Sequence, residues 1–159
     1  MAIQASVKQL SPTQLKAGRR HLHFRTPGAS LGLQPISTSK LIEELEAGLS
    51  FEAFEKLEAN SGLSMTLLAT LIGIPDRTLS RRKSAGRLGP EESERLLRIS
   101  NIFEKAVDLF EGNPEAAVQW LTTPKKALGG HQPIQYSRTE LGAREVENLI
   151  GRIEHGVFA

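Results

Sequence analysis

A short basic segment contains the residues whose types and spacing most clearly point to a chemistry. Positions 77 to 83 read Arg-Thr-Leu-Ser-Arg-Arg-Lys, and Arg87 follows four residues later. Arginine can donate two hydrogen bonds to a guanine edge, serine and threonine can reach bases or phosphates, and further cations suit phosphate contacts. We therefore predict a DNA-binding element, with candidate contact residues Arg77, Thr78, Ser80, Arg81, Arg82, Lys83 and Arg87.

The residues before this segment have the spacing of a helix-turn-helix motif. Ala69 is followed four residues later by Gly73. Such a motif needs a small residue where its helices cross and a glycine that takes a left-handed turn conformation. Four apolar residues could lock the two helices together: Leu68, Ile72, Ile74 and Leu79. The second helix, predicted over 76–84, would then enter a DNA major groove.

Two features leave the details of this motif open. An ordinary helical hairpin with a solvated basic face would show the same local pattern. In addition, Arg82 and Lys83 stand late in the second helix, where the motif usually carries a buried aliphatic residue. The register and packing of that helix end therefore stay undecided at the level of sequence.

Residue patterns for catalysis or metal binding are missing from the sequence. The absence of cysteine excludes disulfides, thiolate metal sites and cysteine nucleophiles. His21 and His23 have no third ligand nearby, and the pair Gly129-Gly130 before His131 is typical of a helix stop. No metalloprotease helix, phosphate-binding loop or nucleophile elbow occurs. We predict no catalytic residue, no metal and no cofactor, and therefore a protein that is not an enzyme.

Composition and charge distribution fit a soluble chain with an anionic partner. The 159 residues are 39% hydrophobic and 24% charged, with a formal net charge of +2. Residues 61–88 hold five basic residues and one acidic residue, whereas residues 36–60 hold two basic and six acidic. This contrast favours local binding of an anion over general basicity. No apolar run reaches the ~20 residues of a membrane helix, and no secretory signal is visible, so we expect a cytoplasmic protein without membrane contact.

Helical periodicity and turn residues divide the rest of the chain into helices, and no segment alternates as a strand would. Predicted helix starts lie at Ser37–Ser39, Ser50, Ser64, Pro75, Gly89, Asn113 and Thr139. The longest periodic segment runs from 90 to 110. Residues 1–36 carry prolines and glycines but little periodicity, so we predict a flexible basic arm there, and 133–138 is predicted to be a connector. The fold class predicted is all-α.

The C-terminal third resembles the toxin-binding domain of Xre/MbcA/ParS-type antitoxins. The resemblance lies in Leu109-Phe110-Glu111-Gly112, Trp120-Leu121-Thr122-Thr123-Pro124, Ala127-Leu128-Gly129-Gly130 and Ile153-Glu154-His155-Gly156. Upstream, the basic segment and Gly86-Arg87-Leu88 resemble the Xre-like domain that the same family carries. The resemblance extends from about Ser37 to Val157. It implies a helix-turn-helix domain over 37–111 and a small helical toxin-binding domain over 112–159.

The resemblance also implies a function. Such a protein would be the antitoxin of a bacterial type II toxin–antitoxin system, neutralising a RES-domain toxin that degrades NAD by covering its active site. It would also bind operator double-stranded DNA and repress its own operon. Because dimeric helix-turn-helix proteins match paired half-sites, we expect a homodimer, and a hetero-oligomer with the toxin. The alternative is a DNA-binding or partition-type adaptor without a toxin partner, since a related branch of the family has such members.

Candidate toxin-binding residues lie around the central tryptophan and at the end of the chain. They are Trp120, Leu128, Arg152, Glu154, His155, Gly156, Val157 and Phe158. The sequence ends in Val-Phe-Ala, which is apolar for an exposed terminus, and burial of a phenylalanine in a partner contributes roughly 1.5–3 kcal/mol before ordering costs. The alternative for Trp120 is a place in the core, and for the tail it is fraying or packing on the chain itself.

Overall fold

The computed structural model describes residues 20–156, and within this range the chain is helical. The α-helices are α2 (Thr38–Ala47), α3 (Phe51–Ser61), α4 (Met65–Leu71), α5 (Asp76–Ala85), α6 (Pro90–Leu109), α7 (Pro114–Leu121), α8 (Pro133–Tyr136) and α9 (Glu140–Glu154). Two short 3-10 turns, η1 (Ala29–Leu31) and η2 (Lys126–Leu128), complete the elements. Residues 20–156 contain two isolated β-bridges but no strand. The all-α prediction is confirmed.

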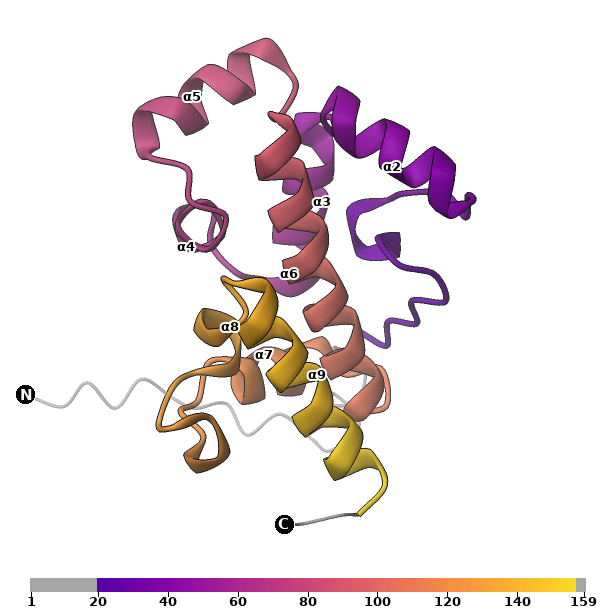
Figure 1. The fold of residues 1–159 in the computed structure, drawn as a ribbon, viewed down its shortest axis with the longest axis vertical. Coiled ribbons are helices and arrows are strands. Elements are labelled where there is room, and N and C mark those ends of the chain that lie inside the picture. Colours follow the sequence, from indigo (N-terminus) through magenta and orange to yellow (C-terminus); the bar gives the residue numbers. More distant parts are fainter. Residues whose placement is uncertain (1–19, 157–159) are drawn as a thin grey trace, which may run out of the picture.

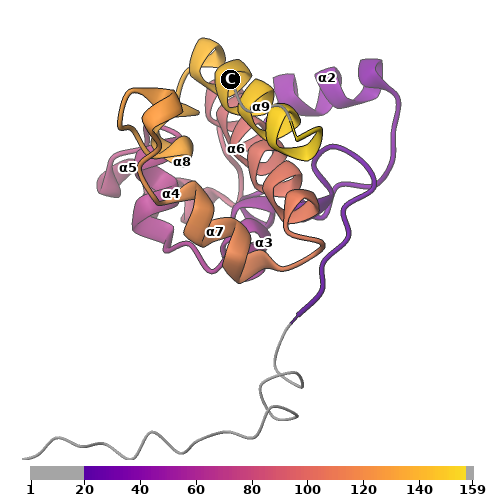
Figure 2. The same ribbon diagram turned by 90° about the horizontal axis from the view of Figure 1, so that it is seen from below.

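The long helix α6 runs through the middle of the molecule, and α2, α3, α7 and α9 pack around it (Figures 1 and 2). Its apolar residues recur at helical spacing, and six of them are at most 1% exposed: Leu96, Ile99, Ile102, Phe103, Ala106 and Val107. The core is one continuous cluster that includes residues from α3 and α4 as well as from α7 and α9. The predicted domains 37–111 and 112–159 therefore share a single hydrophobic core.

Polar side chains begin most helices where the sequence predicts them. The predicted caps accept hydrogen bonds from backbone N–H groups one turn later: Ser37 from Lys40 (3.2 Å), Ser64 from Leu67 (3.1 Å), Asn113 from Ala116 (3.1 Å) and Thr139 from Gly142 (3.1 Å). Ser50 stands at the N-cap of α3, but its side chain makes no such bond. The predicted connector 133–138 differs from the structure, because Pro133 begins the one-turn helix α8.

The segment from residue 20 to 33 does not form the flexible arm predicted over 1–36. Leu31 is 2% exposed, and the ring of Phe24 lies 5.8 Å from that of Phe103. The carboxylate of Glu104 on α6 accepts hydrogen bonds from the N–H groups of Ser30 (2.9 Å) and Gly28 (3.3 Å). These contacts come from residues more than 70 positions away, so the local sequence pattern does not show them. Residues 1–19 lie outside the described part.

Glu104 is the basis of a first prediction. Replacing it with alanine leaves two buried N–H groups without an acceptor, so the free energy of unfolding should fall by about 1–3 kcal/mol. Burial raises the pKa of Glu104 above the ordinary value for glutamate. The folded state therefore holds the proton on Glu104 more tightly than the unfolded state does, and this protonation adds to the free energy of unfolding. The addition is complete below the ordinary pKa and is lost as pH rises through the folded pKa.

The measurement is urea unfolding of the wild type and Glu104→Ala across the acid range up to neutral pH. The advantage of the wild type over the variant should shrink as pH rises. Glu94→Ala is the matched control, because Glu94 lies on the same helix but is exposed, and its effect should stay within about 0.5 kcal/mol. An advantage that grows with rising pH would contradict the assignment.

Candidate DNA-binding and partner-binding surfaces

Helices α4 and α5 form the predicted helix-turn-helix geometry. Ala69 is 1% exposed at the crossing of the helices, and its carbonyl accepts a hydrogen bond from the Ile74 N–H at 2.8 Å. Gly73 takes the left-handed conformation, with φ of 74°, that the turn requires. Of the four predicted locking residues, Leu68, Ile72 and Ile74 are buried and Leu79 is half-buried.

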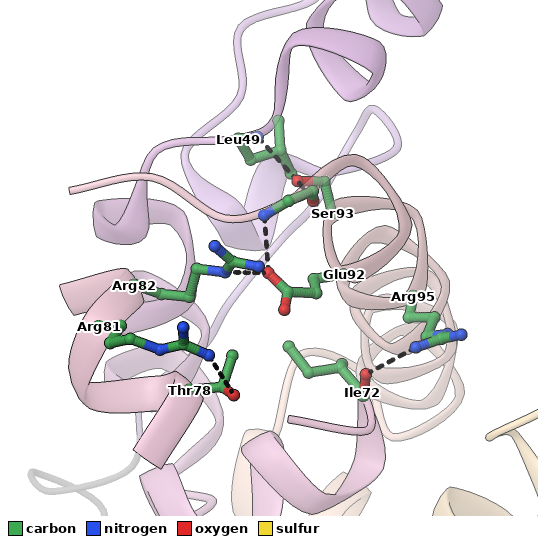
Figure 3. Close-up of polar contacts among 9 residues, drawn as sticks. Leu49, Ile72, Thr78, Arg81, Arg82, Glu92, Ser93 and Arg95 are labelled. Carbon is green, nitrogen blue, oxygen red and sulfur yellow. Dashed lines mark hydrogen bonds and ion pairs between the residues drawn. The ribbon is translucent and has the colours of Figure 1, made fainter. Parts of the chain in front are cut away.

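Helix α5 is an exposed element, as α2 is, and unlike α2 it is rich in cationic side chains. None of its ten residues is buried, and it lies at the edge of the molecule, connected to α4 and to the start of α6 (Figure 1). Arg77, Ser80, Arg81 and Lys83 are exposed, and Thr78 accepts a hydrogen bond from Arg81 Nη2 at 3.2 Å (Figure 3). Six of the seven predicted DNA-contact residues therefore lie on this one helix, and four of the six are exposed.

Arg82 differs from its exposed neighbours. Its Nε lies 2.7 Å from Glu92 Oε1, and its side chain is only 38% exposed (Figure 3). The same carboxylate oxygen accepts the N–H of Gly89 at 2.7 Å, which forms the capping interaction at the start of α6. Arg82 thus occupies the inward position where the motif usually has an aliphatic residue, and Lys83 faces outward. This contact answers the question of register that the sequence leaves open.

Arg87 also has intramolecular partners. Its Nη1 donates hydrogen bonds to the carbonyls of Gly48 (2.8 Å) and Ala47 (3.2 Å), at the C-terminal end of α2, where carbonyls lack helical partners. Gly48 has φ of 86°, and a Cβ there would collide with the Leu88 carbonyl, so this junction requires glycine. Arg87 lies beyond the end of α5 and joins the α2–α3 turn to the segment that leads into α6.

The two predicted toxin-binding residues in this part of the chain, Trp120 and Leu128, differ in exposure. Trp120 is half-buried, and Lys125 Nζ lies 5.1 Å from the centroid of its ring, within range of a cation–π interaction. Burial lowers the pKa of the Lys125 ammonium. Leu128 is 4% exposed and belongs to the core, as does the fully buried Leu121. Leu128 is therefore not part of an accessible surface in this conformation, because it is the one buried residue of η2 and packs in the core.

The predicted residues at the end of the chain lie at one end of α9. Arg152 is half-buried, whereas Glu154, His155 and Gly156 are exposed. Val157 and Phe158 lie outside the described residues. In Figure 1, the C-terminal end of α9 lies well away from α8, which is near the start of the same helix.

A surface hollow at the start of α9 was missed by the sequence analysis. It has a volume of about 770 Å³ and is lined by His131, Gln135, Tyr136, Arg138, Thr139, Leu141, Gly142 and Glu145. Leu141 is 76% exposed, and the rings of His131 and Tyr136 stack 5.6 Å apart. A signal was available: one turn, two turns and three turns after Leu141 stand the polar residues Glu145, Asn148 and Arg152, so Leu141 interrupts the polar face of the helix.

Other candidate sites are not assembled in the described part of the chain. His21 and His23 are exposed, and among residues 20–156 no three histidine, aspartate or glutamate side chains converge as metal ligands would. Within the same range, no helix combines the length and the apolar character needed to cross a membrane.

Two family models match successive parts of the chain. Residues 40–101 match the antitoxin Xre-like helix-turn-helix domain, and residues 105–156 match the antitoxin Xre/MbcA/ParS C-terminal toxin-binding domain. The helices α4 and α5 lie in the first match, and the hollow beside Leu141 lies in the second.

Three relatives are similar over most of the chain. A protein named "Antitoxin Xre" from Yersinia enterocolitica is 38% identical over 130 residues, which are 81% of this chain and 88% of the relative. Another of that name from Photorhabdus laumondii is 36% identical over 131 residues, 82% of this chain and 88% of the relative. A "Prs ADP-ribosylating antitoxin" from Sphingobium sp. is 23% identical over 158 residues, 92% of this chain and 99% of the relative. With both domains matched in order, and with the first two relatives aligned along most of their length, the chain belongs to the Xre family of antitoxins.

Proposed function

We propose that this antitoxin neutralises a RES-domain toxin that degrades NAD, by covering the toxin's active site, and that it represses its own operon. The observation that carries the DNA-binding half is the exposure of α5, which buries none of its residues yet presents three cationic side chains and a serine to solvent. The toxin-binding half is supported by the family match over 105–156 and by the exposed leucine on α9. The protein acts in the bacterial cytoplasm and performs no catalysis itself.

Operator recognition divides the basic residues by role. Arg77 and Arg81 lie one turn apart on α5, so both can face the same groove and donate to base edges. Lys83 lies beyond them and reaches a phosphate, which gives affinity but no sequence preference. A homodimer places two copies of α5 on successive half-sites of the operator.

Toxin binding uses the outward face of the C-terminal domain. Leu141 and Tyr136 give this face an apolar centre, and Arg138 and Glu145 form its polar rim, which is the composition of a protein–protein contact. The far end of α9, with Glu154 and His155, carries the tail toward the NAD site of the toxin. Since covering a site needs only bulk in the right place, the antitoxin supplies no catalytic group.

The DNA-binding role predicts different effects for different cations. Arg77→Ala or Arg81→Ala should weaken operator binding by roughly 1–3 kcal/mol and reduce the preference for operator over other DNA. Lys83→Ala should weaken binding to all sequences and lower the slope of log K against log salt by about 0.9. Titration of labelled promoter DNA at several salt concentrations measures both quantities.

The control for this experiment is Arg144→Ala, which removes an exposed arginine from α9, outside the part of the chain that matches the helix-turn-helix domain, and should leave DNA binding unchanged. Circular dichroism checks that each variant is folded. Normal operator binding and repression by both Arg77→Ala and Arg81→Ala would rule out α5 as the reading helix.

The tail predicts a separation of the two activities. From the described part, deleting residues 155–159 removes only His155 and Gly156, which follow α9, while the lock of α4 and α5 at Leu68, Ile72 and Ile74 is intact. DNA binding should therefore persist, and NAD consumption by the co-purified toxin should return. A chain with a five-residue Gly/Ser tail is the length-matched control and should behave like the deletion. If the deleted chain inhibits NAD loss as well as the intact one, another part of the domain covers the site.

The hollow beside Leu141 predicts the effect of a surface substitution. Leu141→Ser should change the free energy of unfolding by no more than about 0.5 kcal/mol, because the side chain is already exposed. Toxin affinity should fall by about 1.5 kcal/mol or more, the transfer free energy of one buried leucine. Asn148→Ser, at an exposed position two turns along the helix, is the control. Calorimetric titration with purified toxin measures the affinities, and equal affinity for wild type and Leu141→Ser would exclude this face.

A further inference from the structure

The contact between α5 and α6 assigns a role to a residue that lies outside the DNA-binding helix. We propose that Glu92 is a positioning residue for operator recognition, and that it acts through Arg82 to set the orientation of α5. The inference rests on the proposed DNA-binding function and deepens it. It removes Arg82 from the set of phosphate contacts and gives a DNA-related role to an acidic side chain.

The first step is that apolar packing holds α5 weakly. No residue of α5 is buried, and its predicted locking residue, Leu79, is only half-buried. The turn from α4 fixes the N-terminal end of α5 through the hydrogen bond between Ile74 and Ala69. Backbone hydrogen bonds also hold the residues just after the helix: the Gly86 carbonyl accepts the Phe51 N–H and the Leu49 carbonyl accepts the Leu88 N–H, both at 2.9 Å. With both ends held, the rotation of α5 between them is left to a side-chain contact made by the helix itself.

The second step is that the Arg82–Glu92 pair supplies this contact. The Nε–Oε1 distance is 2.7 Å, and the side chain of Glu92 is only 14% exposed, so water screens the pair less than an ordinary surface pair. The Gly89 N–H, also 2.7 Å from Oε1, fixes the carboxylate against the backbone at the start of α6 (Figure 3). Arg82 is thus bound to a rigid point of the central helix, which the core holds in place.

The third step concerns DNA. A bidentate contact between arginine and guanine depends on direction, so a small rotation of α5 misplaces Arg77 and Arg81 without unfolding the protein. If Arg82 instead contacts a phosphate, loss of Glu92 should change DNA affinity in the opposite direction. In that case removal of a neighbouring negative charge would free Arg82 and strengthen binding to all DNA.

The experiment uses Glu92→Gln in the full chain. Glutamine retains an oxygen that can accept the Gly89 N–H but loses the charge that holds Arg82. We expect operator affinity to fall about tenfold, with little change in affinity for unrelated DNA and no change in the salt slope. The matched control is Glu91→Gln, which removes the same charge one residue earlier. Glu91 is 86% exposed and pairs with Arg95 within α6, so operator affinity should stay within about twofold of wild type.

A second variant tests whether the two residues act together. Arg82→Gln should lower operator affinity about as much as Glu92→Gln, and the double variant should be no weaker than either single variant. Urea unfolding and circular dichroism show whether a variant is folded at the temperature of the titration. The cycle compares folded proteins only, and a destabilised variant is titrated at lower temperature.

Three results would overturn the inference. Glu92→Gln could bind operator as well as wild type or more tightly. The losses in the two single variants could add in the double variant. Arg82→Gln could lower the salt slope by about 0.9, as a lost phosphate contact does. Failure of the proposed function looks different: wild-type protein would then not distinguish operator from other DNA, and Arg77→Ala would have no effect.

Discussion

The burial of one face of α6 is the constraint on which the other elements depend. This helix is twenty residues long, and it is the longest of the helices in residues 20–156. Its apolar stripe organises α3, α7 and α9 around one cluster, which explains why two regions that match separate family domains form one continuous core. A helix shared in this way links the position of the DNA-binding helix to the position of the C-terminal domain.

Polar side chains of α6 hold the irregular parts of the chain. Ser93 accepts the Leu49 N–H at 2.8 Å, Glu104 accepts N–H groups from the 28–30 turn, and Arg98 donates to the carbonyl of Arg138 at 3.1 Å. Buried backbone groups outside helices need such partners, because water cannot reach them. The same helix therefore hydrogen-bonds to backbone groups of the loops and packs against the neighbouring helices through apolar side chains. Glu92 belongs to this pattern, since it binds a backbone N–H and an arginine from α5.

The residues that stabilise the fold are buried, whereas the residues proposed to bind partners are exposed. The core is continuous from the N-terminal segment to α9, whereas α5 and the start of α9 contribute exposed side chains. A helix that enters a DNA groove cannot also bury a wide apolar stripe. In α5, the ion pair between Arg82 and Glu92 stands in place of part of such a stripe. The presence of Arg82 instead of an aliphatic residue is the local consequence of this replacement.

Elements whose signals are local could be predicted from the sequence alone. Capping residues, prolines at helix starts and apolar spacing along the chain predict α2 to α7 and α9, and Ala69 with Gly73 predicts the turn before α5, because each depends on neighbours within one or two helical turns. Tertiary structure decided the contacts that join distant positions. Only the fold brings Glu104 to the turn at 28–30, gives Arg82 and Arg87 intramolecular partners, buries Leu128, and leaves Leu141 exposed. The physical reason is that burial and charge pairing depend on which residues meet in space, and a residue's type does not specify its partner.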